Sequence, residues 1–333
     1  MSSSKSVLVV YNTCGINGVE PVDVYKQNIA SILEQTHENK KIIWSSCYNS
    51  QETIQEVVNY FGDKISVNII NHHLAVNQTF NHSVMAGNKL FGDFDGYMYV
   101  AGDVKFNEDQ DSLSRLASRL ENEENGIISP EIDNDNGYYW WFNFEEGKRL
   151  FEVFDSNKDF VVPVGATSNL HAKIFSSKIY KEFGTILPDI FVSYCTETIF
   201  SFIAASIKQK FIITNDVIMN HRTGQISSPE GNCQAYGGNW DTLFPNVRRS
   251  IRQIVDDPMA KQVGLGYEEW VGTYKGKMNI PQDKPYLMHD SNKFDSNGFS
   301  LNDNLKIFIK DNFYLSKDVL DYNRIPSVFL RGR

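Results

Sequence analysis

The first hundred residues alternate short apolar runs with segments of helical periodicity. The apolar runs at 7–10, 41–44, 65–70 and 97–100 have the length of buried strands. Between them, apolar residues recur near a 3.6-residue period over 22–35, 52–61 and 77–89, which predicts three helices. This strict alternation of strand and helix is typical of βαβ units, so the sequence predicts a parallel sheet flanked by helices.

The pattern becomes less regular after residue 103. It predicts helices over 113–120, 177–183 and 196–207, and strands over 126–129, 161–164 leading into 170–175, and 211–214. From about residue 223 the chain is rich in Gly, Asn and Asp, and it contains no internal repeat. We therefore expect three parts: a first half over 1–110, a second half over 111–225, and a C-terminal extension over 226–333 that serves as a lid or in oligomerisation.

Composition and charge exclude several classes of protein. Of the 333 residues, 32 are Lys or Arg and 41 are Asp or Glu, which gives a net charge of −9. An acidic chain without a basic block has little affinity for a phosphate backbone, so nucleic acid is not expected as a structural partner. The sequence has no transmembrane run and no signal peptide. The cysteines are far apart, which predicts reduced thiols and a cytoplasmic location. They are Cys14, Cys47, Cys195 and Cys233.

Polar residues follow three of the predicted strands, over 11–18, 44–50 and 101–105. In a parallel sheet, ligands bind outside the carboxyl ends of the strands, so these segments are the expected site. Residues 15–18 read Gly-Ile-Asn-Gly, which matches neither a dinucleotide fingerprint nor a P-loop. The absence of a basic residue over 13–18 also disfavours a nucleotidyltransferase, which needs one to hold a triphosphate.

A family resemblance rests on four segments that occur in order. Residues 77–87 (NQTFNHSVMAG), followed by a strand and Gly-Asp-Val at 102–104, resemble the core of the family-2-like nucleotide-sugar glycosyltransferases, in which a strand ends in D-x-D. Residues 170–184, 196–208 and 211–221 are similar to later elements of the same group. The resemblance implies an α/β fold of the GT-A type, with a Rossmann-like, mostly parallel sheet flanked by helices. It also implies transfer of a sugar from a nucleotide diphosphate to a hydroxyl acceptor.

The resemblance implies roles for three residues in the chemistry. Asp103 falls on the second carboxylate of D-x-D, while Ala101 stands at the first. Asp103 and His221 are the implied ligands of a Mn²⁺ or Mg²⁺ ion, which neutralises a departing diphosphate. Glu197, at the start of a predicted helix, is the implied general base of an inverting reaction, while the sequence leaves a retaining reaction open. A helix N-terminus favours the ionised carboxylate that a base needs.

The resemblance and the strand ends together suggest which residues contact the two substrates. The donor, a UDP- or GDP-sugar, is expected to contact Tyr11, Asn12, Thr13, Ser46, Asn77, Asn81, Gly102 and Asp103. The segment after the second strand contains no acidic residue, so the identity of the base stays open. Trp140 and Trp141 are candidates for stacking on the acceptor, expected to be a glycan.

Each of these candidates also has an ordinary structural interpretation. Loop residues, helix-end charges and core aromatics account equally for the residue types at these positions. Because Ala101 replaces the first carboxylate, the alternative function is a non-catalytic nucleotide- or carbohydrate-binding protein on a degenerate GT-A fold.

Overall fold

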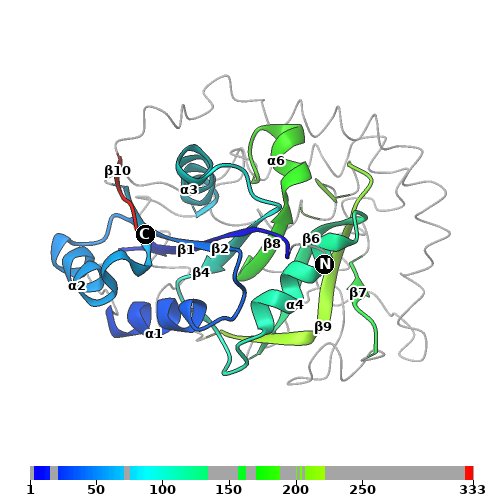
Figure 1. Cartoon of the computed structure of the whole chain (residues 1–333), viewed down its shortest axis with the longest axis horizontal. Coiled ribbons are helices and arrows are strands. Elements are labelled where there is room, and N and C mark those ends of the chain that lie inside the picture. The colour runs from blue at the N-terminus through cyan, green and yellow to red at the C-terminus, as the bar shows by residue number, and fades with distance from the viewer. Residues whose placement is uncertain are drawn as a thin grey trace, which may run out of the picture.

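The computed structural model describes residues 4–15, 22–70, 76–133, 157–162, 170–187, 200, 203–204, 207–221 and 327–332. These residues include a ten-stranded sheet with the order β10-β3-β2-β1-β4-β8-β6-β9-β5, while β7 pairs with β9. In Figure 1, α3 and α6 lie on one side of this sheet and α1, α2 and α4 on the other. The fold is therefore a three-layer arrangement of helix, sheet and helix.

The first half confirms the predicted alternation. Its strands are β1 (Val7–Cys14), β2 (Lys40–Cys47), β3 (Ser66–Ile70) and β4 (Gly96–Ala101), and its helices are α1 (Val22–Leu33), α2 (Gln51–Phe61) and α3 (Val76–Phe91). β3, β2, β1 and β4 run parallel to one another. Their carboxyl ends consequently meet at one edge of the sheet.

The second half mixes strand directions. Its elements are β5 (Val104–Phe106), α4 (Ser112–Ser118), β6 (Asn125–Asp133), β7 (Phe160–Val161), β8 (Ala172–Ser176), α6 (Ser177–Phe183) and β9 (Lys210–His221), and β10 (Ser327–Leu330) follows much later. Short 3₁₀ turns occupy Gly62–Lys64 and Arg119–Glu121. β8 runs antiparallel to both β4 and β6, and β10 runs antiparallel to β3. No helix in the described part of the chain is long and apolar enough to cross a membrane.

The central strand β1 is buried on both faces, as expected for a strand covered by helices on each side. Val7, Val9 and Tyr11 belong to the same apolar cluster as Ile29 of α1. On the opposite face α3 approaches β1 closely at Gly87, where an added Cβ would lie 2.5 Å from Leu8 Cδ2. A larger residue at this position would force the Leu8 side chain to shift, so glycine lets α3 pack this closely without rearrangement.

Local capping sets the ends of the helices. The Ser50 side chain accepts a hydrogen bond from the Thr53 backbone N–H and so begins α2. Gly184 ends α6 in the left-handed conformation, with φ of 73°, and its N–H donates to the Tyr180 carbonyl. Glycine adopts this conformation without steric cost, which explains why the helix stops there.

The sequence prediction differs from the structure in three places. β9 does not end at 214 but continues to His221, because its second half pairs with β6 and then with β5. The strands β5 and β10 were not expected, since each is only three or four residues long. The predicted helix over 196–207 falls largely outside the described residues, as does the end of the strand predicted over 161–164.

Acidification is expected to destabilise the fold through His82. This α3 side chain is 4% exposed, and burial, with the nearby Lys89 charge, lowers its pKa from 6.5 to about 4. The unfolded chain therefore binds the proton more tightly, so this contribution to stability is present above pH 6.5 and is lost as the pH falls toward 4. Between neutral pH and about pH 4.5, the group should account for a loss of about 2–3 kcal/mol.

Chemical denaturation at the two pH values measures this effect. The variant His82→Gln, which cannot titrate, should lose less unfolding free energy on acidification than the unsubstituted protein. Equal losses in the two proteins would contradict the assignment to His82.

Candidate functional site

The candidate site lies at the carboxyl edge of the parallel strands, at the turn that leads from the central strand β4 to β5. Asp103 is in the turn between these strands, directly after Gly102. β5 then pairs antiparallel with the last residues of β9, with Val104 opposite His221. This register brings Asp103 beside His221, although the two residues are far apart in the sequence.

Asp103 and His221 form a mostly buried pair. Nε2 of His221 lies 3.3 Å from Oδ2 of Asp103, and the two side chains are 10% and 14% exposed. Burial raises the pKa of the Asp103 carboxyl. The hydrogen bond from His221 and the electrostatic interactions with His221 and His171 outweigh this effect, so the pKa of Asp103 lies below its usual range. Asp103 is therefore ionised at neutral pH, the form in which a carboxylate binds a cation.

His171 is a third member of this site that the sequence did not single out. Its carbonyl accepts a hydrogen bond of 2.8 Å from the Ala101 backbone N–H, so it stands at the start of β8 beside the end of β4. Its ring stacks on that of His221 with centroids 4.0 Å apart. The stacking restricts the orientation of the His221 imidazole.

The metal-ligating side chains at this site supply only part of the coordination that a divalent cation needs. A carboxylate and an imidazole are both acceptable ligands for Mn²⁺. Over the described ranges, however, no three His, Cys, Asp or Glu side chains are grouped to hold a metal ion. A cation held by Asp103 and His221 therefore needs further oxygen ligands, which a bound diphosphate and water can supply.

The turn that carries Asp103 is anchored from inside the fold. The Tyr11 hydroxyl donates to the Gly102 carbonyl at 2.6 Å, and Nδ2 of Asn28 donates to the same oxygen at 2.8 Å. Both side chains are fully buried. Tyr11 thus lies behind the turn, and the role in donor binding predicted for it stays a prediction.

Three predicted donor residues lie at the ends of β1 and β2. Thr13 Oγ1 accepts from the Trp44 indole at 2.9 Å and from Asn49 Nδ2 at 3.0 Å. Asn49 Nδ2 also donates to Ser46 Oγ at 2.9 Å. Asn12 donates to the Val76 carbonyl at 3.3 Å. These side chains are buried, so in this structure they stabilise the loops at the edge of the sheet.

Tyr48 is an exposed aromatic residue at this edge. It directly follows β2, the residue is 51% exposed, and its backbone has a φ of 55°. A left-handed conformation is uncommon for a residue with a large side chain, and such residues concentrate at functional sites. Hydrophobic periodicity does not identify Tyr48 as a site residue, because its place at this edge depends on where β2 ends.

The two predicted asparagines of α3 are both buried. Asn81 joins α3 to the segment after α6. Its Oδ1 accepts from the backbone N–H groups of Ile186 and Leu187 at 3.3 and 3.0 Å, and its Nδ2 donates to the Leu187 carbonyl at 2.6 Å. Asn77 lies in the first turn of the helix, at the edge where the donor is expected. The remaining predicted site residues, Glu197, Trp140 and Trp141, fall outside the described residues.

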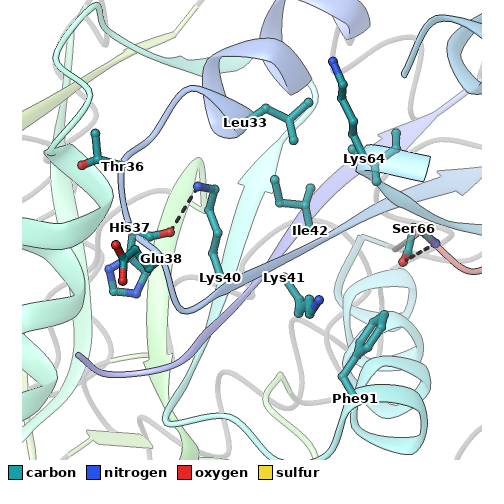
Figure 2. A pocket seen from close by; sticks show the side chains of 12 residues that line it. Leu33, Thr36, His37, Glu38, Lys40, Lys41, Ile42, Lys64, Ser66 and Phe91 are labelled. Carbon is teal, nitrogen blue, oxygen red and sulfur yellow. Dashed lines mark hydrogen bonds between the residues drawn. The ribbon is translucent and has the colours of Figure 1, made fainter. Parts of the chain in front are cut away.

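A cavity of about 360 Å³ lies at the opposite edge, near the starts of β2 and β3 (Figure 2). Lys40, Lys41 and Lys64 contribute to its wall. Lys40 Nζ donates to the carbonyls of Gln35 and His37, just beyond the end of α1. Cations stabilise the carbonyl ends of helices, which accounts for this lysine, and the cavity is remote from Asp103.

Comparison with known proteins identifies the type of fold. No family model and no curated protein matches the sequence. Among solved structures, the mannosyltransferase PcManGT from Pyrobaculum calidifontis, in complex with GDP-Man and Mn²⁺, matches with a TM-score of 0.51 and 10% identity, over 95% of this chain and 89% of that chain. GalNAc-T7 with UDP, GalNAc and Mn²⁺ matches with a TM-score of 0.56 and 11% identity, over 88% of this chain and 58% of that one.

These likenesses confirm the predicted GT-A-type fold. The chain spans little more than half the length of the second structure. At 10–11% identity the likeness shows the fold alone, so the reaction has to be argued from the residues of the site.

The role of Asn81 as a connector can be tested by its effect on stability. Asn81→Ala leaves two buried backbone N–H groups without their acceptor, so the unfolding free energy should fall by about 2–3 kcal/mol in chemical denaturation. The control is Asn59→Ala on α2, because Asn59 is exposed and accepts from Gln55 at the surface. It should change stability by less than about 0.5 kcal/mol. Similar effects of the two substitutions would contradict the connector role.

Proposed function

We propose that this protein is a glycosyltransferase that moves a sugar from a nucleotide diphosphate donor to a hydroxyl acceptor with the help of a divalent cation. The observation that carries the proposal is the register of β5 on β9, which pairs Asp103 with His221 at the carboxyl edge of a GT-A-type sheet. Proteins of this architecture bind ligands at that edge.

Asp103 and His221 are the proposed ligands of the cation. The two structural neighbours each contain Mn²⁺, and a carboxylate with an imidazole suits that ion. When bound, the cation neutralises the diphosphate that leaves the sugar. The protein contributes an ionised carboxylate whose pKa is held low and an imidazole whose orientation is restricted by His171.

The donor is proposed to lie along the carboxyl ends of β2, β1 and β4, in the half that comprises residues 1–110. The neighbours hold GDP-Man in one case and UDP in the other, which supports a UDP- or GDP-sugar. Neighbouring strands are about 4.8 Å apart, so Tyr48 after β2 stands about 10 Å from the strand that leads to Asp103. That separation suits a nucleobase at Tyr48 and a diphosphate at Asp103. Asn12, Thr13, Ser46 and Asn77 border the path between them.

The acceptor is proposed to bind over residues 111–225, with Trp140 and Trp141 as stacking surfaces for a glycan. Glu197 is the proposed general base that takes the proton of the acceptor hydroxyl. Direct attack by that hydroxyl on the anomeric carbon breaks the bond to the diphosphate and inverts the configuration. The role of Glu197 rests on the sequence resemblance, and those of Trp140 and Trp141 rest on the tendency of aromatic faces to pack against sugars.

Donor binding is testable by thermal shift. The unfolding temperature should rise with a UDP- or GDP-sugar plus Mn²⁺ and not with EDTA, because a ligand of the native state at 100 times its Kd adds about 2.7 kcal/mol of stability. Asp103→Asn should abolish the Mn²⁺-dependent part of the shift. The absence of a shift with every donor would contradict the proposed function.

The catalytic step needs a separate measurement. Glu197→Gln should keep the thermal shift with donor and Mn²⁺. It should lower the rate of donor turnover by about 10²–10⁴-fold, because general base catalysis typically contributes a factor of that size. Turnover is followed as release of the nucleoside diphosphate. Unchanged turnover in Glu197→Gln would exclude this residue as the base and leave the donor site standing.

A further inference from the structure

Two polar residues of α1, and a third just beyond its end, all contact the segment that follows β4. Asn28 Nδ2 donates to the Gly102 carbonyl at 2.8 Å, and Ser31 Oγ accepts from the Phe106 backbone N–H at 3.2 Å. Gln35 Oε1 accepts from the Leu113 N–H at 2.9 Å. Asn28 and Ser31 are at positions i and i+3 and share one helix face, so α1 and the residue shortly after it hold this segment at three successive points.

The polar stripe consists of Asn28 and Ser31 of α1 and Gln35 just beyond the helix, and it adjoins Ile29 and Ile32, which belong to the core. Asn28 is 0% exposed and Gln35 is 2% exposed. Burying an amide is costly unless it is hydrogen-bonded, so apolar residues at these positions would pack without that requirement. The bonds of the stripe instead fix one register between α1 and the segment over 102–113.

Of the hydrogen bonds that β1 and α1 make to this segment, the shortest are at Gly102. Its carbonyl accepts from both Asn28 and the Tyr11 hydroxyl, and Asn28 Nδ2 lies 3.3 Å from that hydroxyl. The same carbonyl belongs to the peptide unit that leads into Asp103. Fixing it therefore fixes the direction in which the Asp103 side chain leaves the backbone. His221 approaches the carboxylate from β9.

We propose that Tyr11 and Asn28 are positioning residues, which hold the Gly102–Asp103 peptide so that the Asp103 carboxylate meets the cation. This inference rests on the proposed function. It gives two buried side chains, Tyr11 on β1 and Asn28 on α1, a part in cation binding, although neither of them touches the cation. Groups that orient a metal ligand typically alter metal affinity by about 10–100-fold when they are removed.

The test uses Tyr11→Phe and Asn28→Leu, with Tyr25→Phe as the matched control. Tyr25 is fully buried, and its ring is 6.3 Å from that of Tyr11, but its hydroxyl lies 3.5 Å from Asn49 Oδ1 and not at Gly102. Mn²⁺ affinity is measured from the electron paramagnetic resonance signal of the free ion, with saturating GDP or UDP. Thermal unfolding of each variant, without Mn²⁺ or nucleotide, is measured in parallel.

Tyr11→Phe and Asn28→Leu should each weaken Mn²⁺ binding by about ten-fold or more, while Tyr25→Phe leaves it unchanged at a similar unfolding temperature. Tyr11 and Asn28 both donate to the Gly102 carbonyl and also contact each other, so their double variant should weaken binding less than the product of the single effects. Tyr11→Phe keeps the ring in the core, so this variant should fold even where Asn28→Leu does not.

Unchanged Mn²⁺ affinity in Tyr11→Phe, with binding lost in Asp103→Asn, would overturn the positioning role and leave the proposed function intact. Equal weakening in Tyr25→Phe would also overturn it, because the effect would then be a general loosening of the core. If the unsubstituted protein bound no Mn²⁺ with either nucleotide, both proposals would fall.

Discussion

The antiparallel register of β5 on the far end of β9 is the constraint on which the candidate site depends. β9 pairs with β6 over both of its halves, with a register shift between Ser129 and Glu131 of β6, and it pairs with β5 only through its last three residues. Side chains alternate between the faces of a strand, so a slip of one residue would turn His221 away from Asp103. The stacking of His171 on His221 holds the β9 side of the site, and the hydrogen bonds to Gly102 hold the turn that carries Asp103.

The two halves of the chain hold the site from opposite sides. On one side, β9 supplies the imidazole of His221, and the residue just before β8 supplies that of His171. On the other side, β1 and α1 supply the side chains that donate hydrogen bonds to the Gly102 carbonyl. The buried amide of Asn28 on α1 breaks the local preference for an apolar helix face. Proteins depart from such preferences mainly where function requires it, and here the departure faces the turn that carries Asp103.

Much of the fold was predictable because hydrophobic periodicity reports directly on buried faces. The strands β1 to β4 and their helices follow from it, as do the ends of α2 and α6 at Gly62 and Gly184. β5 and β10 were not predictable, since three or four residues give no period and their pairing partners are distant in sequence. The second half of β9 was hidden by its polar residues, among them Asn215 and Asp216.

The site was predictable to a lesser degree. Asp103 and His221 were found through a resemblance, and the structure brings them together. The contacts of Asn28 and Asn81 were not foreseeable, because both side chains bond to backbone groups that only the tertiary fold places beside them. The sequence signal for Asn28 is a polar residue inside an otherwise apolar helix stripe, and it becomes meaningful once the partner segment is known.

The strand β10 has a consequence for how the chain folds. β3 pairs on one side with β2, its neighbour in sequence, and on the other side with residues 327–330. Until those residues dock, the backbone N–H and C=O groups of β3 are open to pairing with strands of other molecules. Contacts across so long a stretch of chain form slowly, because loop closure is costly before the contact stabilises it. Conditions that delay the docking of β10 therefore extend the period in which β3 is an unpaired edge strand and the sheet is prone to aggregate.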